Sequence, residues 1–139
     1  MVNRLRIVID TNVLLVAISS KSKYHWIFEK LLHSEFDLFI TNDVLTEYEE
    51  VISSKYNTNV AKNVIRTLLL LPNVYQTTIY YHWNLIQSDV TDNKFIDCAV
   101  SSNSHLLVTN DKHFDVVKNL DFPFITVLSI KEFENFLRS

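Results

Sequence analysis

Short runs of hydrophobic residues alternate with segments of helical periodicity along the chain. In the first run, Ile7, Val8 and Ile9 are consecutive, which is typical of a strand covered on both faces, as in a parallel sheet. Four further runs are short enough to be strands and are separated by polar residues. The segments that we predict as strands are Arg4–Asp10, Phe36–Ile40, Val74–Tyr80, Leu106–Val108 and Phe124–Val127.

Between these runs, apolar positions repeat with the spacing of a helix. Thr41–Asp43 is typical of a helix start, and Ser129 of an N-cap residue. The segment His82–Ile86 is compatible with either extended chain or a turn. The segments that we predict as helices are Val13–Ile18, Tyr24–His33, Val44–Ile52, Asn57–Leu71, Asp92–Ser102, Lys112–Leu120 and Ser129–Leu137.

The alternation of strands and helices predicts an α/β fold with a central sheet. The chain has 139 residues, of which 47% are hydrophobic, and this is enough for one domain with one core. No internal repeat or linker interrupts the pattern. We therefore expect a single three-layer α/β domain over residues 1–139, with a mainly parallel sheet of about five strands.

Composition bears on the cellular location of the protein. The longest uninterrupted apolar run is Leu68–Leu71, far below the roughly 18 residues that a membrane span requires. Met1–Arg4 leads directly into a predicted strand, so we expect no signal peptide. Cys98 is the single cysteine and cannot form an internal disulfide. These features predict a cytoplasmic protein without a membrane anchor.

The absence of glycine excludes several classes of active site. Dinucleotide-binding loops, phosphate-binding loops of nucleotide hydrolases and the nucleophile elbow all need glycine for close backbone approach. Asparagine is then the expected residue at left-handed turn positions. The net charge of −3 is unusual for a nucleic-acid-binding protein, unless several carboxylates share divalent cations.

Acidic residues gather where the predicted strands end. Asp10 closes the first strand and Asp111 follows the fourth, while Asp92 opens the helix that leads into the fourth strand. Helical spacing turns Asp92 toward the apolar face of that helix. Glu47 lies one turn into the helix after the second strand. Ligands of such sheets bind beyond the carboxyl ends of the strands, so we expect these four acids to share one edge.

Four carboxylates at one edge would repel one another unless a cation lies among them. Oxygen ligands without soft partners favour Mg²⁺ or Mn²⁺ over zinc. One or two such ions are the usual machinery for attack on a phosphodiester. Asn12 follows closely enough to orient a carboxylate or the attacking water.

Four motifs in this order resemble the PIN-domain family, in particular its branch of toxin components of toxin–antitoxin systems. They are Asp10-Thr11-Asn12-Val13-Leu14, Glu47 in a helix after a strand, Asp92-Asn93-Lys94-Phe95-Ile96-Asp97-Cys98-Ala99, and Thr109-Asn110-Asp111. The resemblance extends from the first strand to Ser129–Leu137. It implies a ribonuclease that depends on Mg²⁺ or Mn²⁺, has a parallel sheet, and leaves 5′-phosphate and 3′-hydroxyl ends.

The resemblance assigns roles to individual residues. Asp10, Glu47, Asp92 and Asp111 match the family's acidic quartet, and Asn12 its frequent polar companion. Asp97 matches a further acid, which we place beside the quartet in a supporting or purely structural role. Relatives often have glycine at the position of Asn110, and asparagine tolerates a left-handed backbone well. Implied partners are an RNA substrate, a cognate antitoxin protein and a second copy of the chain.

Simpler interpretations of the same residues stay open. Asp10 and Asp92 could only cap helices, Asp111 could be a turn residue, and Asn12 could only start a helix. Glu47 and Glu49 flank the apolar face of their helix symmetrically, and only the family pattern selects Glu47.

Other polar and aromatic side chains have less certain roles. A surface role is favoured for His113, a packing role for Cys98, and core or oligomer contacts over base stacking for Tyr80, Tyr81 and Trp83. The lysines that we consider for contacts with the RNA backbone are Lys94, Lys112 and either Lys21 or Lys23.

The main alternative function is a PIN-like module that binds RNA or protein without cutting. A phosphoacceptor receiver domain fits less well, because Asp10-Thr11-Asn12 supplies a single acid and Ser129-Ile130-Lys131 matches its lysine motif poorly. A phosphatase of the Asp-x-Asp-x-Thr type is excluded, because Asn12 stands at the second aspartate position.

Overall fold

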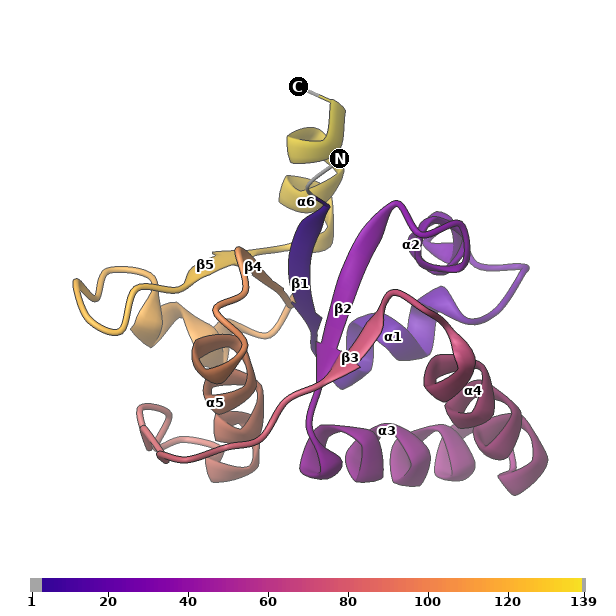
Figure 1. Ribbon diagram of the computed structural model, residues 1–139, viewed down its shortest axis with the longest axis horizontal. Helices are drawn as coiled ribbons and strands as arrows, with labels where there is room; N and C mark the ends of the chain where they lie inside the picture. Colours follow the sequence, from indigo (N-terminus) through magenta and orange to yellow (C-terminus); the bar gives the residue numbers. More distant parts are fainter. Residues whose placement is uncertain (1–3, 139) are drawn as a thin grey trace.

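A five-stranded sheet in which every pairing is parallel forms the centre of the structure (Figure 1), a computed structural model that describes residues 4–138. The strand order is β3-β2-β1-β4-β5. The strands are β1 Leu5–Ile9, β2 Phe36–Ile40, β3 Val74–Gln76, β4 Leu106–Val108 and β5 Thr126–Leu128. The α/β prediction is confirmed; the part of it that concerns residues 1–3 and 139 lies outside the described residues.

Helices cover both faces of this sheet. They are α1 Thr11–Ala17, α2 His25–Leu32, α3 Asn42–Lys55, α4 Thr58–Leu70, α5 Asn93–Ser101 and α6 Ile130–Arg138, with 3-10 helices η1 Val90–Asp92 and η2 Lys112–Val117. α5 packs on β1, β2 and β4, whereas α1 packs between α2 and α3. α6 joins α2, because the Phe133 ring stacks on Trp26 at 5.8 Å. None of the described helices has the length and hydrophobicity needed to cross a bilayer.

Local sequence signals set several helix starts. Thr41 caps α3, because its Oγ1 accepts a hydrogen bond from the N–H of Val44 at 3.1 Å. Ser129 caps α6 in a reciprocal arrangement with Glu132: the Ser129 hydroxyl accepts from the Glu132 N–H at 3.1 Å, and the Glu132 carboxylate accepts from the Ser129 N–H at 2.9 Å. These bonds satisfy N–H groups that have no partner within the helix.

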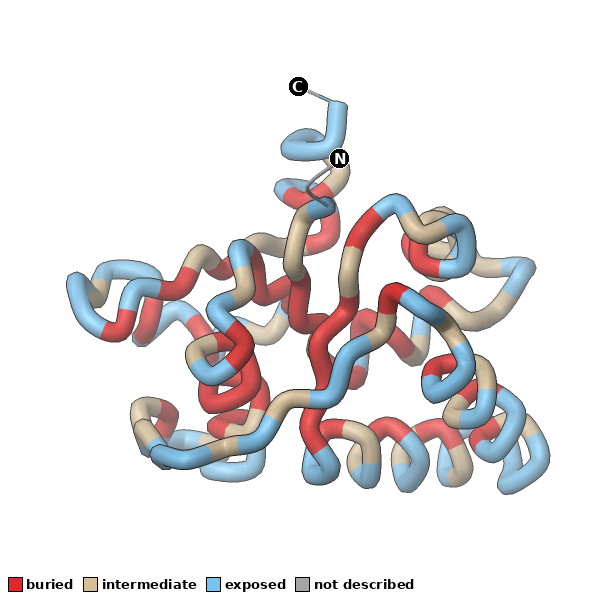
Figure 2. The backbone as a smooth tube through the Cα atoms, in the orientation of Figure 1, coloured by how far each residue is buried: buried red, intermediate tan, exposed pale blue. Residues whose placement is uncertain are grey.

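The hydrophobic core follows the strands that lie in the middle of the sheet. Ile7 and Val8 of β1 have no exposed surface and Ile9 has 1%, so consecutive residues are covered whichever face they point to. Figure 2 shows this buried stretch continuing into the neighbouring strands and the inner side of α5. The uninterrupted apolar run therefore marks a central parallel strand, as the sequence indicated.

Two predicted strands are wrong in their bounds. β3 ends at Gln76 rather than Tyr80, because its only neighbour β2 ends at Ile40, which is paired with Gln76. The last strand begins at Thr126 rather than Phe124, because Thr126 pairs with Leu106, the first residue of β4. In both cases the segment predicted as a strand extends past the end of the neighbouring strand, so its outer residues have no partner for strand hydrogen bonds.

Two local predictions also need correction. The short helix predicted over Lys112–Leu120 is present as the 3-10 helix η2, which ends at Val117 rather than Leu120. Asparagine occupies left-handed positions at Asn84 (φ 52°) and Asn103 (φ 53°), as expected in a chain without glycine. Asn110 is not among the residues with positive φ. Its side chain instead accepts a hydrogen bond from the Ile130 N–H at 2.9 Å, which ties the end of β4 to the start of α6.

Candidate active site

The strand order reverses between β1 and β4, and the candidate site lies at this point of the carboxyl edge. The β1–β4 pairing continues just beyond the strands, because the Asp10 N–H donates to the Val108 carbonyl at 3.0 Å. Helices leave β1 and β4 on opposite sides of the sheet, which opens the edge to a ligand there. Asp10 and Asp111 are thus placed by the topology itself.

Thr109 connects these two acids. Its hydroxyl donates to Oδ2 of Asp10 at 2.7 Å and accepts from the Asp111 N–H at 3.0 Å. Thr109 is 3% exposed, so both bonds are shielded from water. One buried hydroxyl therefore fixes the Asp10 carboxylate and the backbone of Asp111 together.

Asp10 is a buried carboxyl group whose proton is held more tightly than usual. The pKa of Asp10 is raised from 3.8 to about 6, mainly by burial and also by the nearby carboxylates of Asp92 and Asp111, while the hydrogen bond from Thr109 acts in the opposite direction. Asp10 precedes α1, but its side chain makes no capping hydrogen bond to that helix. The carboxylate is turned toward the other acids instead.

Asp92 repeats this arrangement from the opposite face of the sheet. It ends η1, directly before α5, and makes no capping hydrogen bond to that helix. The pKa of Asp92 is raised to about 6, mainly by burial and also by the neighbouring Asp89 and Asp111, while the bond to His113 lowers it. Two buried carboxyl groups with raised pKa values thus face the same edge.

His113 lies between Asp92 and Asp111, which the sequence did not lead us to expect. Its Nδ1 is 3.4 Å from Oδ2 of Asp92 and 3.3 Å from Oδ1 of Asp111. Its backbone N–H donates to Oδ1 of Asp111 at 2.9 Å, so Asp111 also has the turn role considered above. One ligand atom from each of Asp89, Asp92 and His113 lies within 4.8 Å of the others.

Glu47 reaches the same region from α3 but is already engaged. Its Oε1 accepts from Lys94 Nζ at 2.7 Å, and its Oε2 accepts from the Thr11 hydroxyl. Glu49, which the helical pattern could not distinguish from Glu47, is exposed. The structure thus brings Glu47 next to the residue that follows Asp10, and pairs it with a lysine rather than with the other acids.

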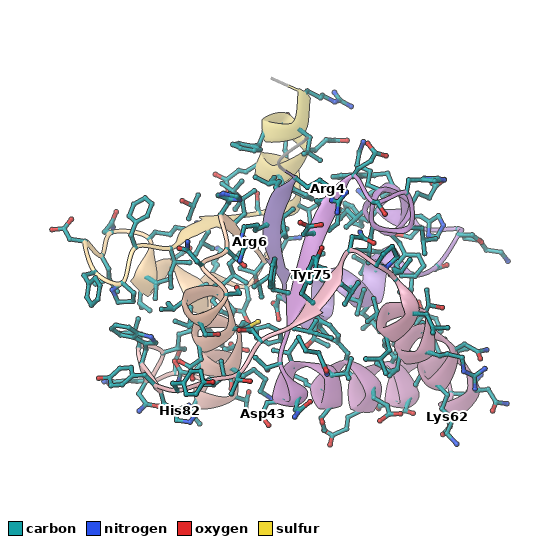
Figure 3. All side chains as sticks on the ribbon, viewed as in Figure 1. Arg4, Arg6, Asp43, Lys62, Tyr75 and His82 are labelled. Carbon is teal, nitrogen blue, oxygen red and sulfur yellow. The ribbon has the colours of Figure 1, made fainter. Side chains whose placement is uncertain are left out.

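Asn12 and Asp97, the two residues expected to support the acids, lie in different places. Asn12 is exposed and lines a cavity of about 280 Å³ together with Asp111. Asp97 is buried and accepts a hydrogen bond from the Trp83 N–H at 3.0 Å, while its other oxygen is 2.9 Å from Nδ1 of His82 (Figure 3). Asp97 thus anchors the loop of residues 77–89 against α5.

Comparison with known families decides the relationship that the motifs suggested. A sequence model of the PIN domain matches residues 6–113, most of the chain. The chain belongs to the PIN domain family. Among curated proteins no match is found.

Solved structures of other PIN domains share the fold at low sequence identity. VapBC2 from Rickettsia felis, bound to a DNA fragment from its promoter, aligns with a TM-score of 0.63 at 17% identity and covers 90% of this chain and 98% of its own. VapC20 from Mycobacterium tuberculosis, described as a toxin that cleaves the sarcin–ricin loop, gives 0.61 at 12% identity, with 83% and 97% covered. VapBC-1 from Haemophilus influenzae gives 0.59 at 15% identity, with 91% and 99% covered.

The acidic edge of this PIN domain could hold a divalent cation. Asp10, Asp92 and Asp111 offer oxygen donors, and Asp10 and Asp92 are buried. The ligand atoms that lie within 4.8 Å of one another come from Asp89, Asp92 and His113, so this group adds a histidine nitrogen to the carboxylate oxygens. Glu47 differs, since the Lys94 ammonium already neutralises it.

Several residues of the site were missed from the sequence. Thr109 and Thr11 each donate a hydroxyl to a predicted acid, and His113 bridges two of them. Lys94, considered above for contacts with RNA, pairs with Glu47 instead. The one available signal was position, because each of these residues directly follows a strand end or lies within two positions of a predicted acid.

Proposed function

We propose that this PIN domain is a metal-dependent endoribonuclease whose site is formed by Asp10, Asp92 and Asp111, with Glu47 at its border. The observation that carries the proposal is the pair of buried carboxyl groups, Asp10 and Asp92, whose pKa values rise to about 6 at the strand-order reversal. Burying like charges beside one another is energetically unfavourable unless a cation offsets them. The family membership of the chain supports the same conclusion.

The side chains would have different roles in such a site. Asp10, Asp92 and Asp111 would hold one or two Mg²⁺ or Mn²⁺ ions, and Thr109 keeps Asp10 oriented through its 2.7 Å hydrogen bond. When bound, these ions supply Lewis-acid activation of water and neutralise phosphate charge, the chemistry of phosphodiester hydrolysis. His113 has its ring at the exposed side of the site, where it can donate a hydrogen bond to a phosphate oxygen.

We further propose that the protein is the toxin of a type II toxin–antitoxin system in the cytoplasm. The support is the likeness of its fold to VapBC2, VapC20 and VapBC-1. An antitoxin protein and a second copy of the chain are the expected protein partners. Expressed alone, the protein should slow growth, and co-expression of a small protein from a neighbouring reading frame should restore it. Normal growth in both cases would remove the toxin role but not the nuclease.

Cleavage of a labelled RNA tests the nuclease proposal directly. We expect the wild type to cut when Mg²⁺ or Mn²⁺ is added, to stop when the metal is chelated, and to leave 5′-phosphate ends. E47Q and E49Q form a matched pair on α3, because Glu47 borders the site and Glu49 is exposed. E47Q should lower cleavage and E49Q should not. RNA cleavage that is indifferent to both D10N and chelation would contradict the proposal.

One observation favours the non-catalytic alternative. The Lys94 ammonium lies 2.7 Å from Glu47 and supplies in part the positive charge that a metal ion would bring. A module of this kind would bind RNA or protein equally well with and without divalent ions. Metal titration against the same labelled RNA distinguishes the two functions, because binding without cutting at every metal concentration supports only the module.

A further inference from the structure

A groove leads away from the acidic edge over the face of the protein that carries α1, α2 and α6. Its inner part, a cavity of about 280 Å³, is lined by residues of α1 and by Asp111. Its outer part, of about 470 Å³, reaches Lys23 and Lys131. Tyr24, Asn110 and Ile130 line both parts, so the two parts adjoin, and the inner part reaches Asp111 of the candidate site.

The charge changes sign along this path. Asp111 stands at the inner end, whereas Lys23 and Lys131 are exposed at the outer end, and neither lysine forms an ion pair within residues 4–138. Glu134 is also at the outer end, but Arg138 lies 3.4 Å from its carboxylate and offsets it. The outer groove is thus positively charged directly beside a strongly acidic edge.

An aromatic ring lies between the two ends. Tyr24 is half-buried, contributes to both parts of the groove, and has Lys23 Nζ 5.1 Å above its ring centre. Base stacking on such rings is worth about 1–3 kcal/mol per base and tolerates any sequence. A lysine beside an aromatic ring is a combination that binds one nucleotide through its phosphate and its base together.

The opposite exit from the acidic edge lacks these properties. The cavity of about 240 Å³ beside the loop of residues 77–89 contains Asp43 and Asp97. Its one lysine, Lys94, is paired with Glu47. Asp97 is engaged by the Trp83 N–H and by His82, so the residues that line this cavity include no unpaired lysine to hold a phosphate backbone.

We propose that single-stranded RNA leaves the acidic edge through the groove past Tyr24, with its phosphates held by Lys23 and Lys131. This inference rests on the proposed ribonuclease function, because it places the substrate of that site. Paired RNA does not offer unstacked bases to a tyrosine ring, so an unpaired segment is the form that the groove fits.

Binding of a short, fluorescein-labelled single-stranded RNA of mixed sequence tests the groove. It is measured by anisotropy at several salt concentrations, with D10N as the background so that the RNA is not cut. Adding K23E and K131E should raise Kd about ten-fold or more. It should also reduce the slope of log K against log salt by about 1.4, because each single-strand phosphate contact contributes about 0.7. The helix dipole favours a negative charge in the first turn of α6, so K131E should not impair folding.

K62E/R66E is the matched control, with the same change of charge. Lys62 and Arg66 are exposed on α4 (Figure 3) and line a different cavity that shares no residue with the groove. This variant should change Kd and the salt slope far less than K23E/K131E. Equal effects of the two variants, or no effect of K23E/K131E, would overturn the proposed path; the second outcome would leave the groove to a protein partner.

Photochemical cross-linking locates the path independently. RNA carrying 4-thiouridine should form cross-links to the peptides that contain Tyr24 and Lys131, and cross-links confined to residues 77–91 would overturn the proposal. These experiments distinguish a failure of the proposed nuclease function from a failure of the proposed RNA path. A wild type that never cuts RNA, but loses affinity when Lys23 and Lys131 are reversed, contradicts the nuclease and supports the groove.

Discussion

Two buried aspartates, one directly before α5 and one inside it, have opposite surroundings. Asp97, inside α5, accepts the Trp83 N–H at 3.0 Å and has His82 within 2.9 Å. Asp92, directly before α5, has Asp89 and Asp111 as neighbours that raise its pKa, and one histidine contact at 3.4 Å. Burial alone therefore does not mark a functional acid.

The difference lies in what offsets the charge. Around Asp97 the protein supplies its own donors, and the result is a loop fastened to a helix. Around Asp92 and Asp10 the neighbours include further carboxylates, which raise the pKa of both groups. The comparison distinguishes an acid that fastens a loop from two acids that we propose as ligands of a cation.

The largest expected effect is on chemistry at the acidic edge. D92N should lower cleavage of a labelled RNA at least about 1,000-fold, since the loss of a charged ligand removes several kcal/mol of transition-state stabilisation. Its fold should persist, as checked by circular dichroism. Cleavage that survives D92N but is lost in D97N would reverse the roles that we assign to the two aspartates.

The second largest effect is on stability: D10N should stabilise the protein, whereas most substitutions destabilise it. The pKa of Asp10 is about 6 when folded and 3.8 otherwise, so the folded state binds the extra proton and stability falls as the pH rises through that interval. D10N avoids this loss and should be more stable than the wild type by up to about 3 kcal/mol at pH 7 without divalent ions.

Urea unfolding at several pH values measures this difference. The gain from D10N should shrink toward zero below about pH 4, where Asp10 is protonated in both states. Added Mg²⁺ should stabilise the wild type more than D10N, because the ion binds the folded wild type preferentially. A D10N variant less stable than the wild type at neutral pH would show that Asp10 is neutralised by the protein itself.

Thr109 tests whether the acids are held as a unit. T109V removes the hydroxyl that joins Asp10 to the backbone of Asp111 and leaves the shape nearly unchanged. Cleavage should fall about 10- to 100-fold, the usual loss when a residue that orients metal ligands is changed. Higher Mg²⁺ concentrations should recover part of it. T46V, at an exposed threonine of α3, is the control and should have no effect on cleavage.

The smallest effect is expected at Asp97. D97A leaves the Trp83 N–H without its acceptor and should cost about 1 kcal/mol, because the loop can turn that group toward water. Hydrogen exchange should become faster in residues 77–89, while cleavage changes only a few-fold. A loss of cleavage as large as that of D92N would mean that Asp97 belongs with the acidic edge after all.

Much of this architecture follows from the sequence. The buried run in β1, the caps Thr41 and Ser129 and the alternation of strands and helices predict the fold, because each depends on neighbours in sequence. The bounds of β3 and β5 do not follow from local patterns, since they depend on where the partner strand ends.

The acids were found by their place after strands, but their partners were not. The contact of Lys94 with Glu47 joins residues 47 positions apart in the chain, and His113 reaches Asp92 across 21 positions. Periodicity cannot reveal such contacts, because they depend on side-chain direction after packing. Helical spacing could not choose between Glu47 and Glu49 and only the family pattern selected Glu47; in the structure Glu49 is exposed and Glu47 is not.

The place of β1 beside β4 has a consequence for the time at which the protein becomes active. Asp10 is made early in synthesis, but its hydrogen-bond partner Thr109 is made almost a hundred residues later. A chain still emerging from the ribosome carries the first acid without the others and cannot assemble the edge. Under the proposed nuclease function, activity would appear only once translation has passed β4, which would leave an interval for a restraining protein to be ready.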